Sequence, residues 1–152
     1  GVADNASMAI IAESSAAVLT TATIKNNILF TTSTGTTKHG FYEYSINATP
    51  AEFMNNDIFS CATSLYRDWD GAGYITTISA MESDLVAESK LASGNLSVDP
   101  VFANLANGDW HLSASTPSTV YSGGLDLSVQ FATDLDGNIR TVPWSIGACE
   151  KN

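Results

Sequence analysis

The segment from Ser93 to Glu150 decides the fold. It reads SGNLSVDPVFANLANGDWHLSASTP from Ser93 and, after a short gap, TDLDGNIRTVPWSIGACE up to Glu150. Each short motif in this segment is common by itself, but all five in one order along a continuous stretch are specific. The five are an Asp-Pro-x-Phe turn at 99–102, a Gly-Asp-aromatic-x-Leu strand at 108–112, a Thr-Pro loop at 116–117, an Asp-x-Asp-Gly-Asn-x-Arg turn at 134–140 and an Ile-Gly-Ala-x-Glu terminus at 146–150.

This order of motifs resembles the closing segment of secreted right-handed parallel β-helix proteins, both pectate-lyase-like and surface-anchored. The resemblance implies an all-β fold, a right-handed parallel β-helix (a solenoid) with a short inserted helix near residues 81–91 and a C-terminal closing segment. It places the parallel β-helix rungs in residues 1–92. Residues 93–152 then form the closing rungs and the C-terminal cap of the same domain.

An internal repeat supports stacked strands. The pair Asn26-Asn27 recurs as Asn55-Asn56, 29 residues later, and apolar residues flank both pairs. In a stacked repeat, equivalent Asn side chains bond to one another from layer to layer. We therefore expect one pair to lie about 5 Å, one strand spacing, from the other. The alternative is that each Asn-Asn marks an unrelated turn.

Short runs rich in branched and aromatic residues, punctuated by Gly, Asn, Asp and Pro, predict strands. One helix interrupts them, over Met81–Leu91, with Ser83 or Asp84 as its N-cap and Gly94 just past its end. The predicted strands are Ser7–Ala12, Ala17–Thr23, Ile28–Thr32, Phe41–Ile46, Glu52–Met54, Asp57–Ala62, Tyr74–Ile78, Leu96–Val98, Trp110–Ser113 and Ser128–Ala132.

The charge and composition of the chain limit the classes of partner that it can bind. The 152 residues suit one domain, and six Lys+Arg against sixteen Asp+Glu give a formal net charge of −10. Such a chain lacks the clustered cations that nucleic acid or an anionic membrane surface requires. No apolar run reaches the length of a membrane span. The two cysteines, Cys61 and Cys149, fit either one disulfide or two buried thiols.

The segment 67–71, Arg-Asp-Trp-Asp-Gly, concentrates a cation, two carboxylates and an aromatic ring. Polysaccharide lyases of the resembled family use carboxylates for calcium, a basic residue as the base and aromatics to stack on sugar. Asp68 and Asp70 would share one side of an extended strand. The alternative, which the sequence favours, is a structural turn in which Arg67 and Trp69 are at most glycan contacts.

Tyr42 and Tyr44 form a second aromatic pair, on one face of a predicted strand. Stacked aromatics on an outward face could bind glycans, and they could equally be core residues beneath a loop. With Arg67 and Trp69 they complete the set of candidate glycan-binding residues.

Metal sites are not expected. Asp134, Asp136 and Asn138 alternate as in half of a calcium loop, but the glycine and distal Glu of a complete loop are misplaced or missing. A hairpin turn is the favoured interpretation, so we expect no cofactor, with calcium as the alternative. His39, in a polar loop, and His111, half-buried on a strand, lie far in sequence from either cysteine, and no zinc site is expected.

The sequence therefore indicates a non-catalytic extracellular or cell-surface scaffold, for adhesion, glycan binding or end-to-end assembly. The alternative is the C-terminal fragment of a polysaccharide lyase or glycoside hydrolase with its active site mostly upstream. Only Lys25, Lys38 and Arg67 supply cations to the predicted rungs, too few for a cleft that binds acidic sugar. No Gly-x-Ser-x-Gly elbow or phosphate-binding glycine loop is present.

The first strands also predict a partner. Ser7–Ala12 and Ala17–Thr23 are apolar and Thr-rich, and Glu13 is the one charge between Asp4 and Lys25. An unprotected strand edge pairs readily with another polypeptide, here further rungs or another subunit. We expect the 152-residue chain to associate with increasing concentration in sedimentation or light scattering. A stable monomer across the accessible concentration range would contradict this expectation.

Overall fold

The computed structural model describes residues 6–12, 22–32, 35, 37–45, 47–69 and 71–151. Its elements, in chain order, are β1 (Ala6–Ala12), β2 (Thr23–Lys25), β3 (Ile28–Phe30), β4 (Thr37–Glu43), β5 (Glu52–Met54), β6 (Asp57–Phe59), β7 (Ser64–Arg67), β8 (Tyr74–Ile75), α1 (Ile78–Ala87), β9 (Leu91–Ser93), β10 (Phe102–Asn104), a 3₁₀ turn (Leu105–Asn107), β11 (Asp109–Leu112) and α2 (Ser118–Tyr121).

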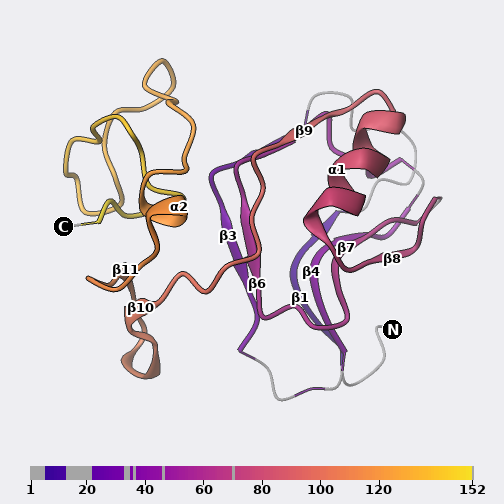
Figure 1. The fold of residues 1–152 in the computed structure, drawn as a ribbon, viewed down its shortest axis with the longest axis horizontal. Helices are drawn as coiled ribbons and strands as arrows, with labels where there is room; N and C mark the ends of the chain where they lie inside the picture. Colours follow the sequence, from indigo (N-terminus) through magenta and orange to yellow (C-terminus); the bar gives the residue numbers. More distant parts are fainter. Residues whose placement is uncertain are drawn as a thin grey trace.

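The strands form several small sheets. The strand orders are β1-β4-β7-β8, β2-β5-β9, β3-β6 and β10-β11. Pairing is parallel in the first three sheets except between β7 and β8, and β10 is antiparallel to β11. Figure 1 shows the first three sheets around one interior, with α1 beside them. β1, β2 and β3 are edge strands of these sheets, and the predicted partner at this edge stays a prediction.

The predicted fold class is wrong. Within the described residues the chain is a small mixed α/β domain of short sheets with two helices, and it forms no long parallel β-helix. Parallel pairing extends over three strands in each of two sheets and over two strands in a third, and then ends. After β9 the chain turns into an antiparallel pair and loops that lie beside the stacked strands (Figure 1).

The predicted helix exists, but its bounds are wrong. α1 begins after Thr77, whose extended backbone and side-chain oxygen cap the helix by accepting from the Ala80 N–H at 3.3 Å. Met81 and Leu85, four residues apart, are buried against the sheets. Leu91 opens β9 instead of ending the helix. Among the described residues, no helix combines the length and apolar character that crossing a membrane requires.

The strand predictions were uneven. Glu52–Met54 is confirmed as β5. Ser128–Ala132 instead contains a turn and no strand, and Leu96–Val98 makes only a single bridge, between Leu96 and Asp57. β4 starts four residues before the predicted Phe41. Most of Ala17–Thr23 lies outside the described residues. β7, β9 and β10, which span three or four residues each, were not predicted.

The predicted asparagine contact is confirmed. The backbone N–H and Nδ2 of Asn27 donate to Asn56 Oδ1 at 3.0 and 3.1 Å. The same two groups of Asn56 donate to Asn95 Oδ1 at 3.0 and 3.1 Å. Asn95 is a third member that the repeat did not reveal, because Gly94 replaces the first Asn of the pair. We call Asn27, Asn56 and Asn95 the asparagine ladder.

The residue that precedes each member of the asparagine ladder has a left-handed backbone conformation. Asn26, Asn55 and Gly94 have φ values of 54°, 51° and 69°, in the left-handed region that Asn and Gly tolerate. Asn26 exchanges two hydrogen bonds of 2.8 Å with the backbone of Leu125, and Asn55 Nδ2 donates to Gly123 O at 2.7 Å. The outward amides therefore hold the closing segment against the strands.

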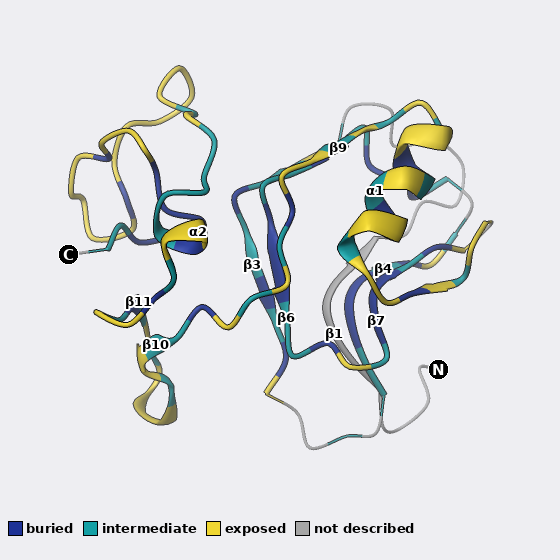
Figure 2. Cartoon of the chain, viewed as in Figure 1, coloured by how far each residue is buried: buried dark blue, intermediate teal, exposed yellow. Residues whose placement is uncertain are grey.

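Two apolar cores lie behind these contacts (Figure 2). The larger core fills the space between the first three sheets and α1, and rings of Phe41, Phe53 and Tyr66 pack within it at centroid separations of 5.1 to 5.6 Å. The smaller one lies in the closing segment, around Val120 and Ile146. Both cysteines are buried free thiols, so of the two arrangements that the sequence allowed, the bridge is not formed.

Asn56→Ala should destabilise the fold by about 2 to 4 kcal/mol, because it strands several buried polar groups at once. Asn56 is fully buried, and its side chain also donates to Ile24 O at 3.0 Å. Urea unfolding followed by circular dichroism measures the loss. The exposed Asn107→Ala is the control and should change stability by less than about 0.5 kcal/mol. Equal effects of the two substitutions would contradict the role of the ladder.

Candidate functional site

Three neighbouring strands set one row of side chains. Tyr42, one residue before the end of β4, pairs in register with Arg67 at the end of β7, and Arg67 pairs with Tyr74 on β8. Tyr44 and Trp69 follow two residues after Tyr42 and Arg67, so they extend the same side of the sheet. We call these five residues the Arg67–aromatic face.

The guanidinium lies at the centre of this face. Its carbon is 4.4 Å from the ring centroid of Tyr74, 5.8 Å from that of Tyr42 and 5.9 Å from that of Trp69, within cation–π range. Tyr44 continues the aromatic surface, with its ring 5.8 Å from Tyr42 and 5.7 Å from Trp69. The structure thus brings together all four residues that the sequence singled out as glycan contacts.

The outer rings of the face reach solvent. Tyr44, Trp69 and Tyr74 are 41%, 49% and 59% exposed, while Tyr42 and Arg67 are half-buried among them. The sequence missed Tyr74, although Gly71-Ala72-Gly73 before it signals a turn that returns the chain alongside β7. Exposed rings of this size on one face form an amphipathic surface with few rotatable bonds.

Asp68 builds the turn that presents Trp69. Its Oδ2 accepts from the Ala72 N–H at 2.6 Å, and its own N–H donates to Gly73 O at 2.9 Å. A Cβ at Gly71 would overlap the Asp68 carboxylate, which would then have to shift from its present position. Asp68 is buried and acts in the turn, as the structural interpretation predicted. Asp70 lies outside the described residues.

His39 supports the face from below. The sequence placed it in a polar loop, which is wrong: it lies on β4, 2% exposed, with Nδ1 2.7 Å from Ser64 Oγ. Its ring stacks on Tyr74 at 5.5 Å and meets Tyr42 edge-on at 5.2 Å. Burial, and then the charge of Arg67, lower the pKa of His39, so the ring is neutral at pH 7.

An acidic layer lies beneath the face. Glu43 is 1% exposed, the Tyr66 hydroxyl donates to its Oε1, and its Oε2 has no hydrogen-bond partner among the described residues. Burial, together with the charges of Asp68 and Glu88, raises the pKa of Glu43 to about 7. Carboxylate oxygens of Asp68, Asp84 and Glu88 lie within 4.8 Å of one another, an oxygen set that suits a hard cation.

The three candidate calcium ligands do not converge. Asp134 accepts from the backbone N–H groups of Asp136 and Asn138 at 3.0 and 2.8 Å, and from that of Glu150 at 3.2 Å. Asn138 Nδ2 also donates to it, while Asp136 Oδ2 faces His111. Residues 134–138 thus form the hairpin turn that the sequence favoured.

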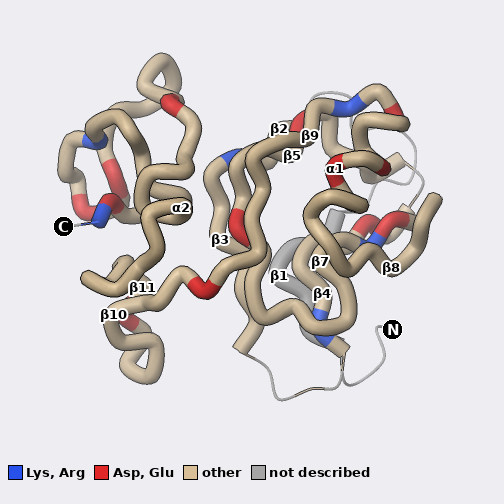
Figure 3. The backbone as a smooth tube through the Cα atoms, viewed as in Figure 1, with Lys and Arg blue, Asp and Glu red and all other residues tan. Residues whose placement is uncertain are grey.

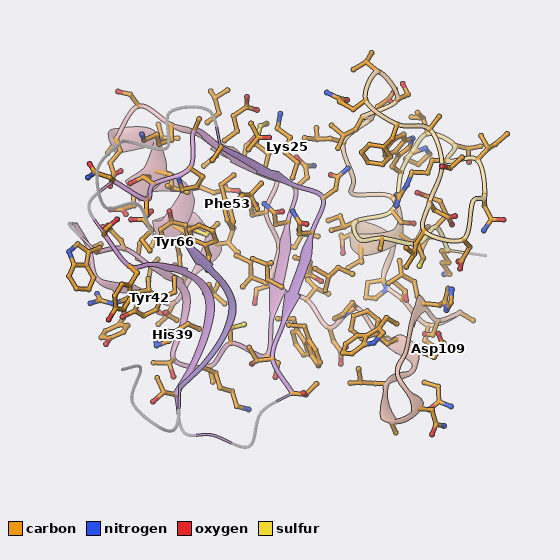
Figure 4. All side chains as sticks on the ribbon, turned by 180° about the vertical axis from the view of Figure 1, so that it is seen from behind. Lys25, His39, Tyr42, Phe53, Tyr66 and Asp109 are labelled. Atoms are coloured by element: carbon orange, nitrogen blue, oxygen red, sulfur yellow. The ribbon has the colours of Figure 1, made fainter. Side chains whose placement is uncertain are left out.

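A hollow of about 660 Å³ separates the strands from the closing segment, and Lys25, Trp110, Phe131 and Arg140 line part of it. Arg140 closes the chain end: its guanidinium donates to Glu150 Oε1 at 2.6 Å and to Gly147 O at 2.9 Å. Phe102 and Trp110 pack edge to face at its wall, with ring centroids 5.3 Å apart, and the Arg140 guanidinium lies 5.8 Å from the Phe131 ring. In Figure 4, Tyr42 and His39 lie at the end of the molecule opposite Asp109.

Comparison with protein-family models, with curated proteins and with solved structures finds no match for this chain. The resemblance to pectate-lyase-like proteins therefore remains an interpretation of the sequence. Any function must be argued from the geometry of the site itself.

Glu43 makes stability depend on pH. Its pKa in the folded state, about 7, lies above the ordinary 4.5, so the folded state keeps a proton that the unfolded chain loses. The stability that Glu43 contributes is therefore fully present below about pH 4.5. It decreases as the pH rises to about 7 and does not change further above that pH. Glu43→Gln should remove a fall of about 1 to 3 kcal/mol.

Urea unfolding from pH 4 to pH 8 measures this as the difference between wild type and Glu43→Gln. Burial also raises the pKa of Asp57, to about 6. Because Asp57 is present in both proteins, its contribution cancels in the difference. Glu52→Gln, which alters a carboxylate paired with Lys25 at the surface, is the control and should keep the fall. A fall of the same size in Glu43→Gln would refute the assignment.

Proposed function

We propose that the chain is a non-catalytic glycan-binding module, extracellular or on the cell surface, with the Arg67–aromatic face as its binding surface. The observation that carries the proposal is one guanidinium held against three rings, with Tyr44, Trp69 and Tyr74 each 41% or more exposed. Tyr42 and Tyr74 are held by the strands that carry them, and Tyr44 and Trp69 pack against each other just beyond the ends of β4 and β7. Binding would therefore cost little conformational entropy.

The chemistry of the face fits sugar. The apolar faces of a pyranose ring pack on aromatic side chains, while the hydroxyl groups around its edge need hydrogen bonds. Arg67 donates one hydrogen bond to a described residue, from Nη1 to Asp68 O at 3.1 Å, and a guanidinium has five N–H groups. The rings of Tyr42, Tyr44, Trp69 and Tyr74 together offer room for more than one sugar unit.

Charge favours a neutral glycan. The chain carries a formal net charge of −10, and Glu43 and Asp68 lie behind the face. Figure 3 shows Lys and Arg scattered singly along the trace instead of gathered in a patch. A single guanidinium cannot offset the repulsion that a chain of uronic acids would meet here.

Catalytic turnover of a glycan has less support than binding of a glycan. Glycoside hydrolysis needs two carboxyl groups that flank the scissile bond. Among the described residues beside the face, Asp68 is committed to the turn and Glu43 is 1% exposed beneath it. The alternative, a lyase or hydrolase fragment, therefore rests on residues that the face does not present.

Titration calorimetry with neutral and acidic oligosaccharides tests the proposal. We expect a neutral oligosaccharide to bind, and Trp69→Ala or Tyr44→Ala to weaken the affinity about tenfold or more, equivalent to roughly 1.4 kcal/mol. Trp110→Ala is the matched control, because Trp110 is 52% exposed at the other end of the molecule. It should leave the affinity unchanged.

Two results would overturn the proposal. One is the absence of binding across the panel by a chain that circular dichroism shows to be folded. The other is release of reducing or unsaturated sugar that Arg67→Ala abolishes, which would establish the enzyme alternative instead.

A further inference from the structure

Three side chains of different chemistry meet in the closing segment. His111 on β11, Asp136 in the hairpin turn and Cys149 near the C-terminus place a ring nitrogen, a carboxylate oxygen and the thiol sulfur within 4.8 Å of one another. His111 Nε2 lies 2.9 Å from Asp136 Oδ2. We call them the His-Asp-Cys cluster. The sequence separated them by up to 38 positions, so no spacing motif revealed them.

A fourth residue orients the histidine. Asp109 Oδ1 lies 2.5 Å from His111 Nδ1 and also accepts from the His111 backbone N–H at 3.1 Å. The ring is thereby turned so that Nε2 faces Asp136 and Cys149. A carboxylate on the far nitrogen of a histidine is the usual support of a metal-ligating imidazole.

The other two ligands are also held in position. The Asp136 backbone N–H donates to Asp134 Oδ1 at 3.0 Å within the turn. The neighbouring Leu135 N–H donates to Ala148 O at 2.9 Å, which ties the turn to the segment that carries Cys149. Backbone hydrogen bonds thus fix the spacing of the cluster, a requirement of a preorganised metal site.

We propose that the His-Asp-Cys cluster binds one Zn²⁺ ion through His111 Nε2, an Asp136 carboxylate oxygen and the Cys149 thiolate, with water as the fourth ligand. Imidazole, carboxylate and thiolate are the three ligand types that zinc takes, and tetrahedral coordination spaces them about 3.3 to 3.8 Å apart. Small shifts from the present spacing reach that geometry. The thiol proton and any proton on Nε2 pass to solvent as the ion binds.

The ligand set selects the ion. Ca²⁺ and Mg²⁺ prefer oxygen ligands alone, whereas a nitrogen and a sulfur ligand favour zinc among the divalent ions that are not redox-active. His111 and Asp136 are partly exposed, so solvent has access to the site, while Cys149 is 6% exposed and protected. The bound ion would tie β11, the hairpin turn and the chain end together. It is independent of the glycan face.

Cobalt substitution provides the direct test. The full chain, reduced and freed of metal with a chelator, is titrated with Co²⁺ and then with Zn²⁺. We expect one equivalent of Co²⁺ to bind, with the thiolate-to-cobalt charge-transfer band and the visible bands of tetrahedral coordination, and Zn²⁺ to displace it. Zn²⁺ should also raise the melting temperature.

Variants assign the ligands. Cys149→Ser should abolish the charge-transfer band, and His111→Gln or Asp136→Asn should weaken binding strongly. Asp109→Asn, which only orients His111, should weaken it about 10- to 100-fold. Cys61→Ser is the control for the thiol and should keep the band, and Asp126→Asn is the control for loss of an exposed carboxylate in the same segment.

Circular dichroism confirms that each variant is folded. Absence of Co²⁺ and Zn²⁺ binding by the folded wild type would overturn the proposal. So would a charge-transfer band that persists in Cys149→Ser or disappears in Cys61→Ser.

Discussion

The asparagine ladder is the constraint on which the rest of the structure depends. Asn56 both donates to and accepts from its neighbours in the ladder, and it has no surface exposed to solvent. A shift of one strand by a single residue would leave buried amide groups unsatisfied, at a cost of about 1 to 3 kcal/mol each. β2, β5 and β9 are three residues long each, so their backbone pairing alone fixes the register weakly. The ladder therefore fixes the register of these strands.

Both candidate sites inherit this register. The core that the ladder closes also holds Phe41 and Tyr66, which alternate along β4 and β7 with the outward Tyr42 and Arg67. A slip would turn the outward residues inward. On the other side, the left-handed Asn26 and the Asn55 amide dock the closing segment that carries the His-Asp-Cys cluster. The two Asn pairs thus position two surfaces at opposite ends of the molecule (Figure 4): the ladder residues set the strand register, and Asn26 and Asn55 hold the closing segment.

The sequence predicted correctly those features that depend on the conformation or hydrogen bonding of one particular residue type. The recurring Asn pair was informative because its first Asn tolerates the left-handed backbone and its second offers both a donor and an acceptor to the next layer. The hairpin at 134–138 was readable from its Asp-Gly-Asn turn. Tyr42, Tyr44, Arg67 and Trp69 were marked by type and spacing. That they share a face follows from pairing between β4 and β7, which the sequence did not predict.

Long-range arrangement accounts for the failures. The fold class was wrong because a motif series in the last third was taken to imply stacked strands throughout, whereas the parallel sheets end at β9 and an antiparallel pair follows. The helix bounds were wrong because Thr77 caps earlier than Ser83 or Asp84. The His-Asp-Cys cluster was missed because its members become neighbours only once the closing segment folds back on itself.

Hydrogen exchange of the Asn side-chain amides, followed residue by residue by NMR, tests the central role of the ladder most directly. We predict that the Nδ2 protons of Asn56 and Asn95 exchange as slowly as the backbone amides of β5, through unfolding of the strands, while those of exposed Asn107 exchange freely. Free exchange of the Asn56 amide in a chain whose β5 backbone stays protected would show that the ladder does not hold the fold.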